Sequence, residues 1–106
     1  MERPTAVDGL RERVASCLGE RAGSLSRLGV RSVSLVGSLA RGDERSDSDV
    51  DLLVDLAPDA TFDLVDLVTL KEELAAELGR EVDILFKGAL RAYVAEAVER
   101  DALRLL

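Results

Sequence analysis

The sequence has no histidine and no tryptophan, and it contains a single cysteine, one tyrosine and two phenylalanines. Without histidine, Ser-His-Asp and Cys-His catalysis are excluded, as are most zinc sites. Cys17 cannot form an intramolecular disulfide, and its apolar position in a predicted helix indicates a buried thiol rather than a nucleophile. Chemistry in this chain must therefore depend on carboxylates, hydroxyls, guanidinium groups and any bound hard metal ion.

Basic residues are also scarce, because 14 lysines and arginines against 21 acidic residues give a net charge of −7. Nucleic acids and anionic membranes need clustered positive charge, so this balance argues against either as a direct partner. No apolar run approaches the ~20 residues of a membrane span, and the first residues lack the basic-then-apolar order of a secretion signal. We therefore expect a cytoplasmic protein with one compact domain over residues 1–106.

Hydrophobic periodicity predicts the order of helices and strands. Apolar residues at three- and four-residue steps predict three helices. The first runs from Thr5 to about Leu28 with weak points at Gly19 and Gly23, and the second runs from Phe62 to Leu78 and ends at Gly79. The third begins after Gly88 and continues through "ALRLL", and its residues Leu90, Val94, Ala97 and Val98 are expected to face the core. Alternation predicts strands over residues 30–37, 50–56 and 81–87, with a turn or short helix over 38–42. This order favours an α+β fold in which a small mixed sheet carries helices packed on one face.

Three aspartates share one phase relative to their apolar neighbours. Side chains alternate along a strand, so Asp49 and Asp51 project to the same side with Cα atoms roughly 6–7 Å apart. Asp83 has the same phase in another strand, and pairing of the two strands brings a third carboxylate to that face. Two charges about 4 Å apart repel by roughly 4 kcal/mol at an effective dielectric near 20, which something must offset. A pair of Mg²⁺ ions does so, and such pairs clamp both oxygens in phosphoryl or nucleotidyl transfer.

Upstream, the strand over residues 30–37 ends in the dipeptide Gly37-Ser38. Glycine allows close approach of the backbone, and a serine hydroxyl with adjacent N–H groups can hold phosphate oxygens. The ten residues between Ser38 and Asp49 leave room for a turn that brings this phosphate cradle beside the carboxylates. The sequence therefore indicates a site for a nucleotide and metal ions.

The stretch "LVGSLARGDERSDSDVDLLV" resembles the signature of the nucleotidyltransferase superfamily that includes polymerase beta and kanamycin nucleotidyltransferase. Its form "GSxARG…SDSDxDLLV" looks most like the minimal nucleotidyltransferase (MNT) branch, and the resemblance extends through Asp83 in "VDILF". It implies that Asp49 and Asp51 are catalytic metal ligands. Asp83 is then the third acid, which helps to bind metal and activates the acceptor hydroxyl.

The resemblance also implies that Gly37 and Ser38 bind the triphosphate and that Arg41, in the "ARG" of the branch, steadies phosphate charge. The implied activity is transfer of AMP from ATP, with two Mg²⁺ ions, to a hydroxyl. Many MNT proteins are antitoxins whose partner is a HEPN-domain ribonuclease that they modify on tyrosine, so the resemblance implies a HEPN toxin as partner here. Two alternatives remain open: a module that binds nucleotide and neutralises its partner by docking, and a nucleotidyltransferase for a small molecule.

Other interpretations of the same residues fit less well. "GSLARG" lacks the lysine and hydroxyl of a P-loop, and "DSDVD" lacks the turn glycine and the final glutamate of a calcium loop. Asp47 with Asp49 is an alternative ligand pair. Several remaining polar residues are interpreted as structural: Asp43, Asp47 and Asp55 as acids of a solvated loop, Ser46 and Ser48 as turn residues, and Tyr93 as a packing residue. Arg41 fits a phosphate contact and a local salt bridge equally well.

Overall fold

The computed structural model describes residues 6–42 and 49–106 of the chain. The expectations for Asp43, Ser46, Asp47 and Ser48 lie outside the described residues, as does the one for the side chain of Tyr93. In chain order the elements are α1 (Ala6–Glu20), α2 (Ala22–Arg27), β1 (Val30–Val36), α3 (Gly37–Arg41), β2 (Val50–Leu56), α4 (Leu64–Leu78), β3 (Val82–Phe86), the 3₁₀ turn η1 (Lys87–Ala89), α5 (Ala92–Arg100) and β4 (Leu103–Arg104).

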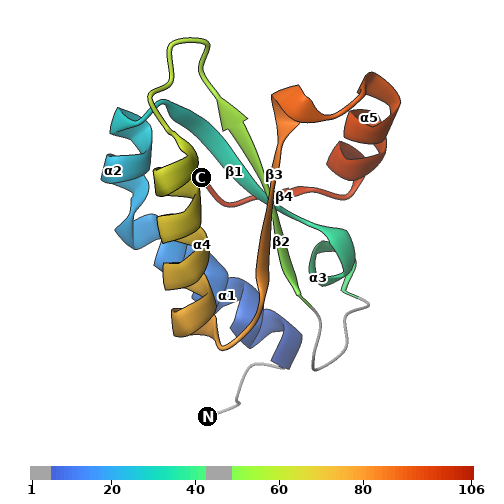
Figure 1. The fold of residues 1–106 in the computed structure, drawn as a ribbon. Helices are drawn as coiled ribbons and strands as arrows, with labels where there is room; N and C mark the ends of the chain where they lie inside the picture. The colour runs from blue at the N-terminus through green and yellow to red at the C-terminus, as the bar shows by residue number, and fades with distance from the viewer. Residues whose placement is uncertain (1–5, 43–48) are drawn as a thin grey trace.

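The strands form one mixed sheet in the order β3-β2-β1-β4 (Figure 1). β2 runs antiparallel to β1 and parallel to β3, and α4 makes the crossover that a parallel pair requires. The predicted α+β class with a small mixed sheet is therefore confirmed. Among the described residues, no helix is both long and apolar enough to cross a bilayer.

The core lies on one face of the sheet, where the apolar stripes of α1 and α4 meet the strands. Fully buried side chains from each element build it, among them Val14, Leu18, Val33, Leu35, Leu52, Val54, Leu74 and Val82. Three residues of the stripe predicted for α4, Leu70, Leu74 and Leu78, are buried, and the fourth, Leu67, is half-buried. α4 begins with a capping box between Asp63 and Asp66 and ends at Gly79, whose φ of +66° is left-handed.

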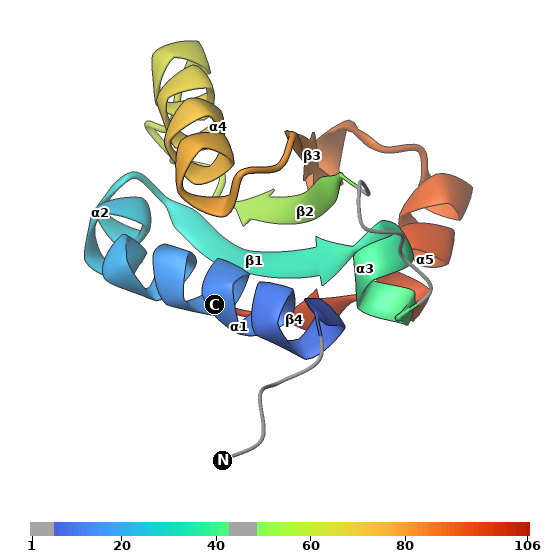
Figure 2. The same ribbon diagram turned by 90° about the horizontal axis from the view of Figure 1, so that it is seen from below.

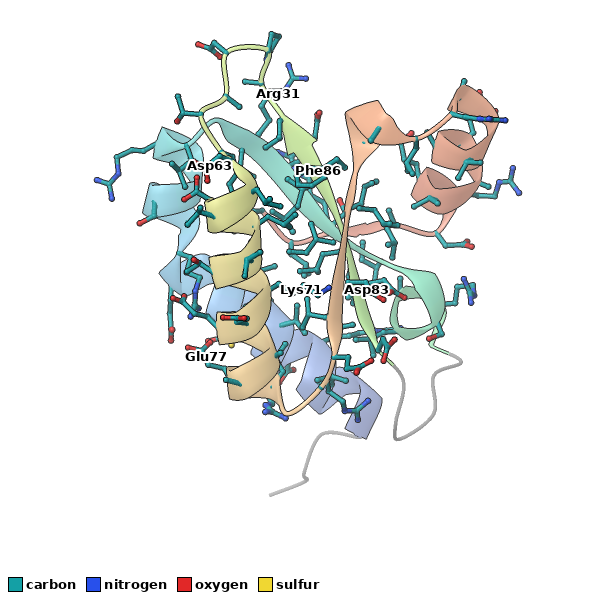
Figure 3. All side chains as sticks on the ribbon, in the orientation of Figure 1. Arg31, Asp63, Lys71, Glu77, Asp83 and Phe86 are labelled. Carbon is teal, nitrogen blue, oxygen red and sulfur yellow. The ribbon has the colours of Figure 1, made fainter. Side chains whose placement is uncertain are left out.

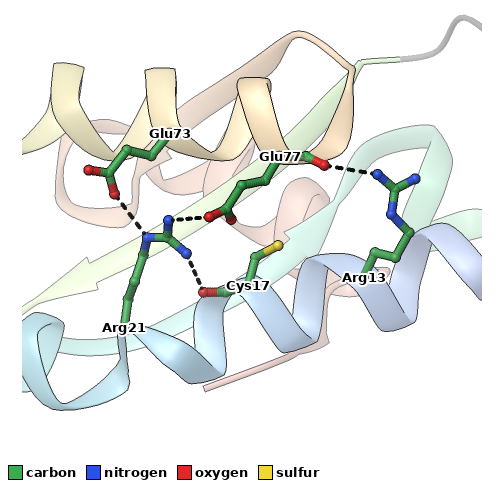
Figure 4. A network of polar contacts seen from close by, with 5 residues as sticks. All are labelled: Arg13, Cys17, Arg21, Glu73 and Glu77. Atoms are coloured by element: carbon green, nitrogen blue, oxygen red, sulfur yellow. Dashed lines mark hydrogen bonds and ion pairs between the residues drawn. The ribbon is translucent and has the colours of Figure 1, made fainter.

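A polar network joins the α1–α2 junction to α4 (Figure 4). The guanidinium of Arg21 lies 3.1 Å from Glu73 and 2.9 Å from Glu77, and it also donates to the carbonyl of Cys17. Cys17 is half-buried rather than buried, and burial raises the pKa of its thiol. The protonated thiol is a poor nucleophile, which agrees with its interpretation as a packing residue.

The C-terminal part departs from the prediction in two ways. Helix α5 ends at Arg100, and "ALRLL" contains the short strand β4, which pairs with β1. The predicted packing of helices on one face holds for α1, α2 and α4, whereas α5 lies on the other side of the strands (Figures 1 and 2). Its apolar residues therefore do not enter the core: Val94 and Val98 are half-buried and Ala97 is exposed.

Candidate functional site

The parallel pairing of β2 with β3 sets Asp51 directly opposite Asp83. Paired residues of neighbouring parallel strands point to the same face, and such strands lie about 4.8 Å apart. Asp49 comes one residue before β2 and is exposed. The structure thus brings Asp51 and Asp83 side by side at one end of the sheet, with Asp49 just before β2, and the register that does so could not be derived from the sequence.

Asp51 is the most enclosed of these acids. Burial raises the pKa of its carboxyl, the negative charges of Asp83 and Asp49 raise this pKa further, and the Arg41 guanidinium partly opposes them. A raised pKa means that the folded protein holds a proton at this position more tightly than the unfolded chain does. Ionisation of Asp51 therefore opposes folding, first because the carboxyl is partly buried and second because two other acids lie near it.

Gly37 lies against the carboxylate of Asp51. Its φ of +76° is left-handed, and a Cβ built on it would fall 2.5 Å from Oδ2 of Asp51. Both observations require glycine at this position. Ser38, the next residue, is half-buried in the first turn of α3. The predicted dipeptide and the predicted carboxylate are therefore immediate neighbours.

A cavity of about 370 Å³ opens beside this contact. Its polar lining consists of Gly37, Arg41, Asp51 and Asp101, and its apolar wall is formed by Val36, Leu85, Val94, Ala97 and Val98. Small-molecule sites typically combine such an apolar wall with a few polar groups. The cavity lies between the sheet and α5, so the helix that was predicted to enter the core instead forms one wall of the candidate site.

Asp83 faces a different space. Its Oδ1 lies 3.8 Å from Nζ of Lys71 on α4 (Figure 3), and both side chains are about half-exposed. Asp83 and Lys71 line a second cavity of about 470 Å³ between α4 and β3, together with Val68 and Ala75. The register pair of Asp51 and Asp83 therefore stands at the boundary between two cavities, one lined by each acid.

The three carboxylates do not converge on one point. Within residues 6–42 and 49–106, no group of three or more acidic or thiol side chains is close enough to hold a metal ion. The contact with Lys71 explains the position of Asp83, but a surface ion pair of this kind contributes only about 0–1 kcal/mol.

The interpretation of Asp55 as an acid of a solvated loop is wrong. Asp55 lies within β2, is half-buried, and is 3.3 Å from the guanidinium of Arg31. Its role is nonetheless structural. Sequence reasoning also missed Lys71 and the apolar wall. Leu85 could have been predicted to lie on the same sheet face as Asp83, because the two residues share one phase of the strand. Nothing in the sequence indicates that Lys71 lies near β3 or that α5 packs beside Asp51.

The charge on Asp51 yields a stability prediction. Asp51→Asn should raise the melting temperature in metal-free buffer at neutral pH, with a gain of roughly 0.2–1 kcal/mol, the range for cross-strand charge pairs. The gain should shrink as the pH falls through the raised pKa of Asp51, because the wild-type carboxyl then becomes protonated and no longer holds a partly buried charge near the other acids. Mg²⁺ should raise the melting temperature of the wild type but not that of Asp51→Asn. Thermal denaturation of both proteins at several pH values, with and without Mg²⁺, tests these expectations, and an identical response of the two would contradict them.

Comparison with known proteins agrees with this geometry. The family model described as "nucleotidyltransferase domain" matches residues 18–105. The chain is 39% identical, over 73% of its length and 76% of the relative, to the protein adenylyltransferase MntA of Thermococcus cleftensis. It is similar to a minimal nucleotidyltransferase of solved structure, with 35% identity, a TM-score of 0.74 and coverage of 96% of this chain and 98% of the other. An MNT antitoxin in complex with the tri-AMPylated HEPN toxin of Shewanella oneidensis shares the fold at 17% identity and a TM-score of 0.63, over 94% of this chain and 71% of the other.

Proposed function

Because this chain belongs to the nucleotidyltransferase domain family and is a nucleotidyltransferase, we propose that it transfers AMP from ATP to a hydroxyl of a protein partner. The observation that carries this proposal is the contact of Gly37 with Asp51, opposite Asp83, at the boundary between two cavities. One cavity offers a glycine, an arginine and a carboxylate to a nucleotide. The other leaves Asp83 accessible to an acceptor.

The proposed reaction is a displacement at the α-phosphate. The acceptor oxygen forms a bond to the α-phosphorus, the bond from that phosphorus to the bridging oxygen of pyrophosphate breaks, and pyrophosphate leaves with the electron pair. Asp83 accepts the proton of the acceptor hydroxyl, a role that fits a half-exposed carboxylate lining the second cavity. Gly37 and Ser38 bind the phosphates from the backbone side, and Arg41 offsets their charge from the cavity wall.

The carboxylates fit Mg²⁺ by their chemistry. Asp49 and Asp51 are hard oxygen donors two residues apart, and burial together with the nearby charges of Asp83 and Asp49 raises the pKa of Asp51, so a cation beside it would favour the ionised form. We propose that Asp49 and Asp51 hold two Mg²⁺ ions, with Asp83 joining them once its side chain leaves Lys71. When bound, such ions neutralise phosphate charge and align the α-phosphate with the attacking oxygen. The carboxylates of Asp49 and Asp51 would set the position of these ions.

The proposed partner is a HEPN-domain toxin, and the proposed acceptor is one of its tyrosines. Support comes from the relative that is named a protein adenylyltransferase and from the antitoxin that is found with an AMPylated HEPN toxin. The second cavity is lined by Val68 and Ala75 beside Lys71 and Asp83, so an aromatic ring could contact its apolar part while the hydroxyl faces Asp83. In this proposal the chain acts as an antitoxin in the cytoplasm, where ATP is available.

The direct test is a transfer assay on a co-purified pair. The chain is co-expressed with a HEPN-domain protein, incubated with ATP and Mg²⁺, and the mass of the intact partner is measured. We expect AMP-sized additions that require ATP and Mg²⁺ and that map to tyrosine. A partner that is inhibited but unmodified would support a docking module instead, and transfer to an added aminoglycoside would support a small-molecule enzyme. Either result would overturn the proposed reaction.

A further inference from the structure

We infer that Arg11 is a positioning residue that fixes the segment 37–41 against the carboxylates and thereby sets the affinity for ATP. This inference rests on the proposed function, since it concerns the same site. Arg11 lies on α1, and nothing in the sequence links it to the nucleotide. Its role emerges only from the contacts that its side chain makes across the fold.

The guanidinium of Arg11 donates to two carbonyls at the end of α3. Nε and Nη2 reach the carbonyl oxygen of Leu39 at 3.0 and 2.8 Å, and Nη2 reaches that of Ala40 at 3.2 Å. Arg11 itself is half-buried, and Leu10 and Val14 on the same helix belong to the core. The side chain therefore joins α3 to a helix that cannot move without disturbing the core.

α3 needs such an anchor because it has only five residues. A helix this short cannot sustain itself, and the carbonyls of its last turn have no partner within the helix. Leu39 and Ala40 are buried and hold α3 by apolar contact, but such contact has no preferred direction. Hydrogen bonds from the planar guanidinium of an arginine are directional, so they fix both the position and the rotation of the carbonyls that accept them.

The rotation of α3 matters because both ends of the helix belong to the candidate site. Gly37 at its start is so close to Asp51 that a Cβ would not fit, and Arg41 at its end lines the nucleotide cavity. A shift of α3 by a fraction of an ångström would move the phosphate-facing groups away from the carboxylates. Arg11 therefore acts on the nucleotide through α3 and is not itself a catalytic residue.

Arg13 provides a matched control. It lies on the same helix and also donates from Nη2 to a backbone carbonyl, that of Glu77 at 2.9 Å (Figure 4), but this bond joins α1 to α4 rather than to α3. Arg13 makes one exposed bond where Arg11 makes three part-buried ones, but if arginines on α1 merely stabilise the fold, loss of either should leave the nucleotide affinity of the folded chain unchanged. If Arg11 positions the phosphate segment, only its loss should affect the nucleotide.

The experiment compares Arg11→Ala, Arg11→Lys and Arg13→Ala in the full chain. Calorimetry with a non-hydrolysable ATP analogue and Mg²⁺ gives the affinity, and amide hydrogen exchange reports on residues 37–41. We expect Arg11→Ala to weaken binding roughly tenfold, as charged hydrogen bonds of this strength imply. Exchange at 37–41 should become faster in the same variant. Arg11→Lys should fall between Arg11→Ala and the wild type, because an ammonium lacks the fork, and Arg13→Ala should bind like the wild type.

The outcomes separate this inference from the proposed function. Wild-type chain that does not bind the analogue would overturn the proposed function and the inference together. Wild-type binding that Arg11→Ala leaves unchanged, or that Arg13→Ala weakens equally, would overturn the inference alone. Should Arg11→Ala fail to fold, Arg11→Lys retains the charge and most of the side chain and is compared with Arg13→Ala in the same way.

Discussion

Asp51→Asn should reduce AMP transfer by roughly 10³-fold or more, because loss of a carboxylate that we propose to bind metal would remove several kcal/mol of transition-state stabilisation. Asparagine keeps the shape of the side chain but loses the charge. Asp51 is central to the candidate site: it lies against Gly37, stands opposite Asp83 and lines the cavity proposed to bind the nucleotide. Initial rates of partner labelling, with ATP labelled at the α-phosphate, measure the effect.

Asp55→Asn is the matched control for this substitution. Asp55 lies on the same strand and, four residues on, on the same face of the sheet as Asp51, and it too is half-buried. It is paired with Arg31 and lines a separate cavity with Lys87 and Glu99, so its replacement should leave transfer close to the wild-type rate. Equal losses in the two variants would indicate a general effect of acidic charge on this face, and full activity of Asp51→Asn would exclude Asp51 from the chemistry.

Asp51→Asn should therefore yield a chain that is more stable without metal and yet inactive. These two expectations have one cause, the ionised carboxylate that the fold holds partly buried and close to Asp83 and Asp49. A charge cluster of this kind opposes folding and serves binding, as is common at functional sites. The combination of higher stability and lost transfer also distinguishes a functional role of Asp51 from a structural one. Replacement of an acid that stabilised the fold would lower the melting temperature.

Secondary structure was predictable from the sequence where a segment was long enough to show a hydrophobic period. Helix α4 and strands β1, β2 and β3 follow the apolar pattern closely, because each buries one face against the same core. β4 has only two residues, too few for alternation to appear, so the same segment was predicted as the end of a helix. The apolar residues of α5 fit either face of the sheet equally well, and only the structure shows that they line the cavity beside Gly37 and Asp51.

The candidate site was predictable as a set of residues but not as an arrangement. Period-two alternation put Asp49, Asp51 and Asp83 in one phase, and the structure brings them to one end of the sheet. It could not show that Asp83 contacts Lys71 or that each acid lines its own cavity, because these features depend on the register of β2 with β3 and on the position of α4. Register and the packing of helices are properties of the whole fold.

Gly37→Ala should impair both stability and transfer. The left-handed backbone at Gly37 costs an L-residue about 1–2 kcal/mol, which corresponds to a fall in melting temperature of roughly 4–16 °C for a domain of this size. The new Cβ would also fall 2.5 Å from Oδ2 of Asp51, so either the carboxylate or α3 must move. We expect transfer to fall by roughly 100-fold, the loss typical of misplacing reacting groups by about 1 Å.

Gly79→Ala separates the two causes. Gly79 has a similar left-handed φ of +66°, but no atom lies within 4 Å of the Cβ that alanine would add. Gly79→Ala should therefore carry the backbone cost alone and lower the melting temperature by a similar amount. The folded fraction of this variant should transfer AMP at the wild-type rate. If Gly79→Ala lost transfer as fully as Gly37→Ala, instability would explain both variants. A loss confined to Gly37→Ala would mean that the distance between the phosphate-facing backbone and the carboxylate of Asp51 controls the reaction.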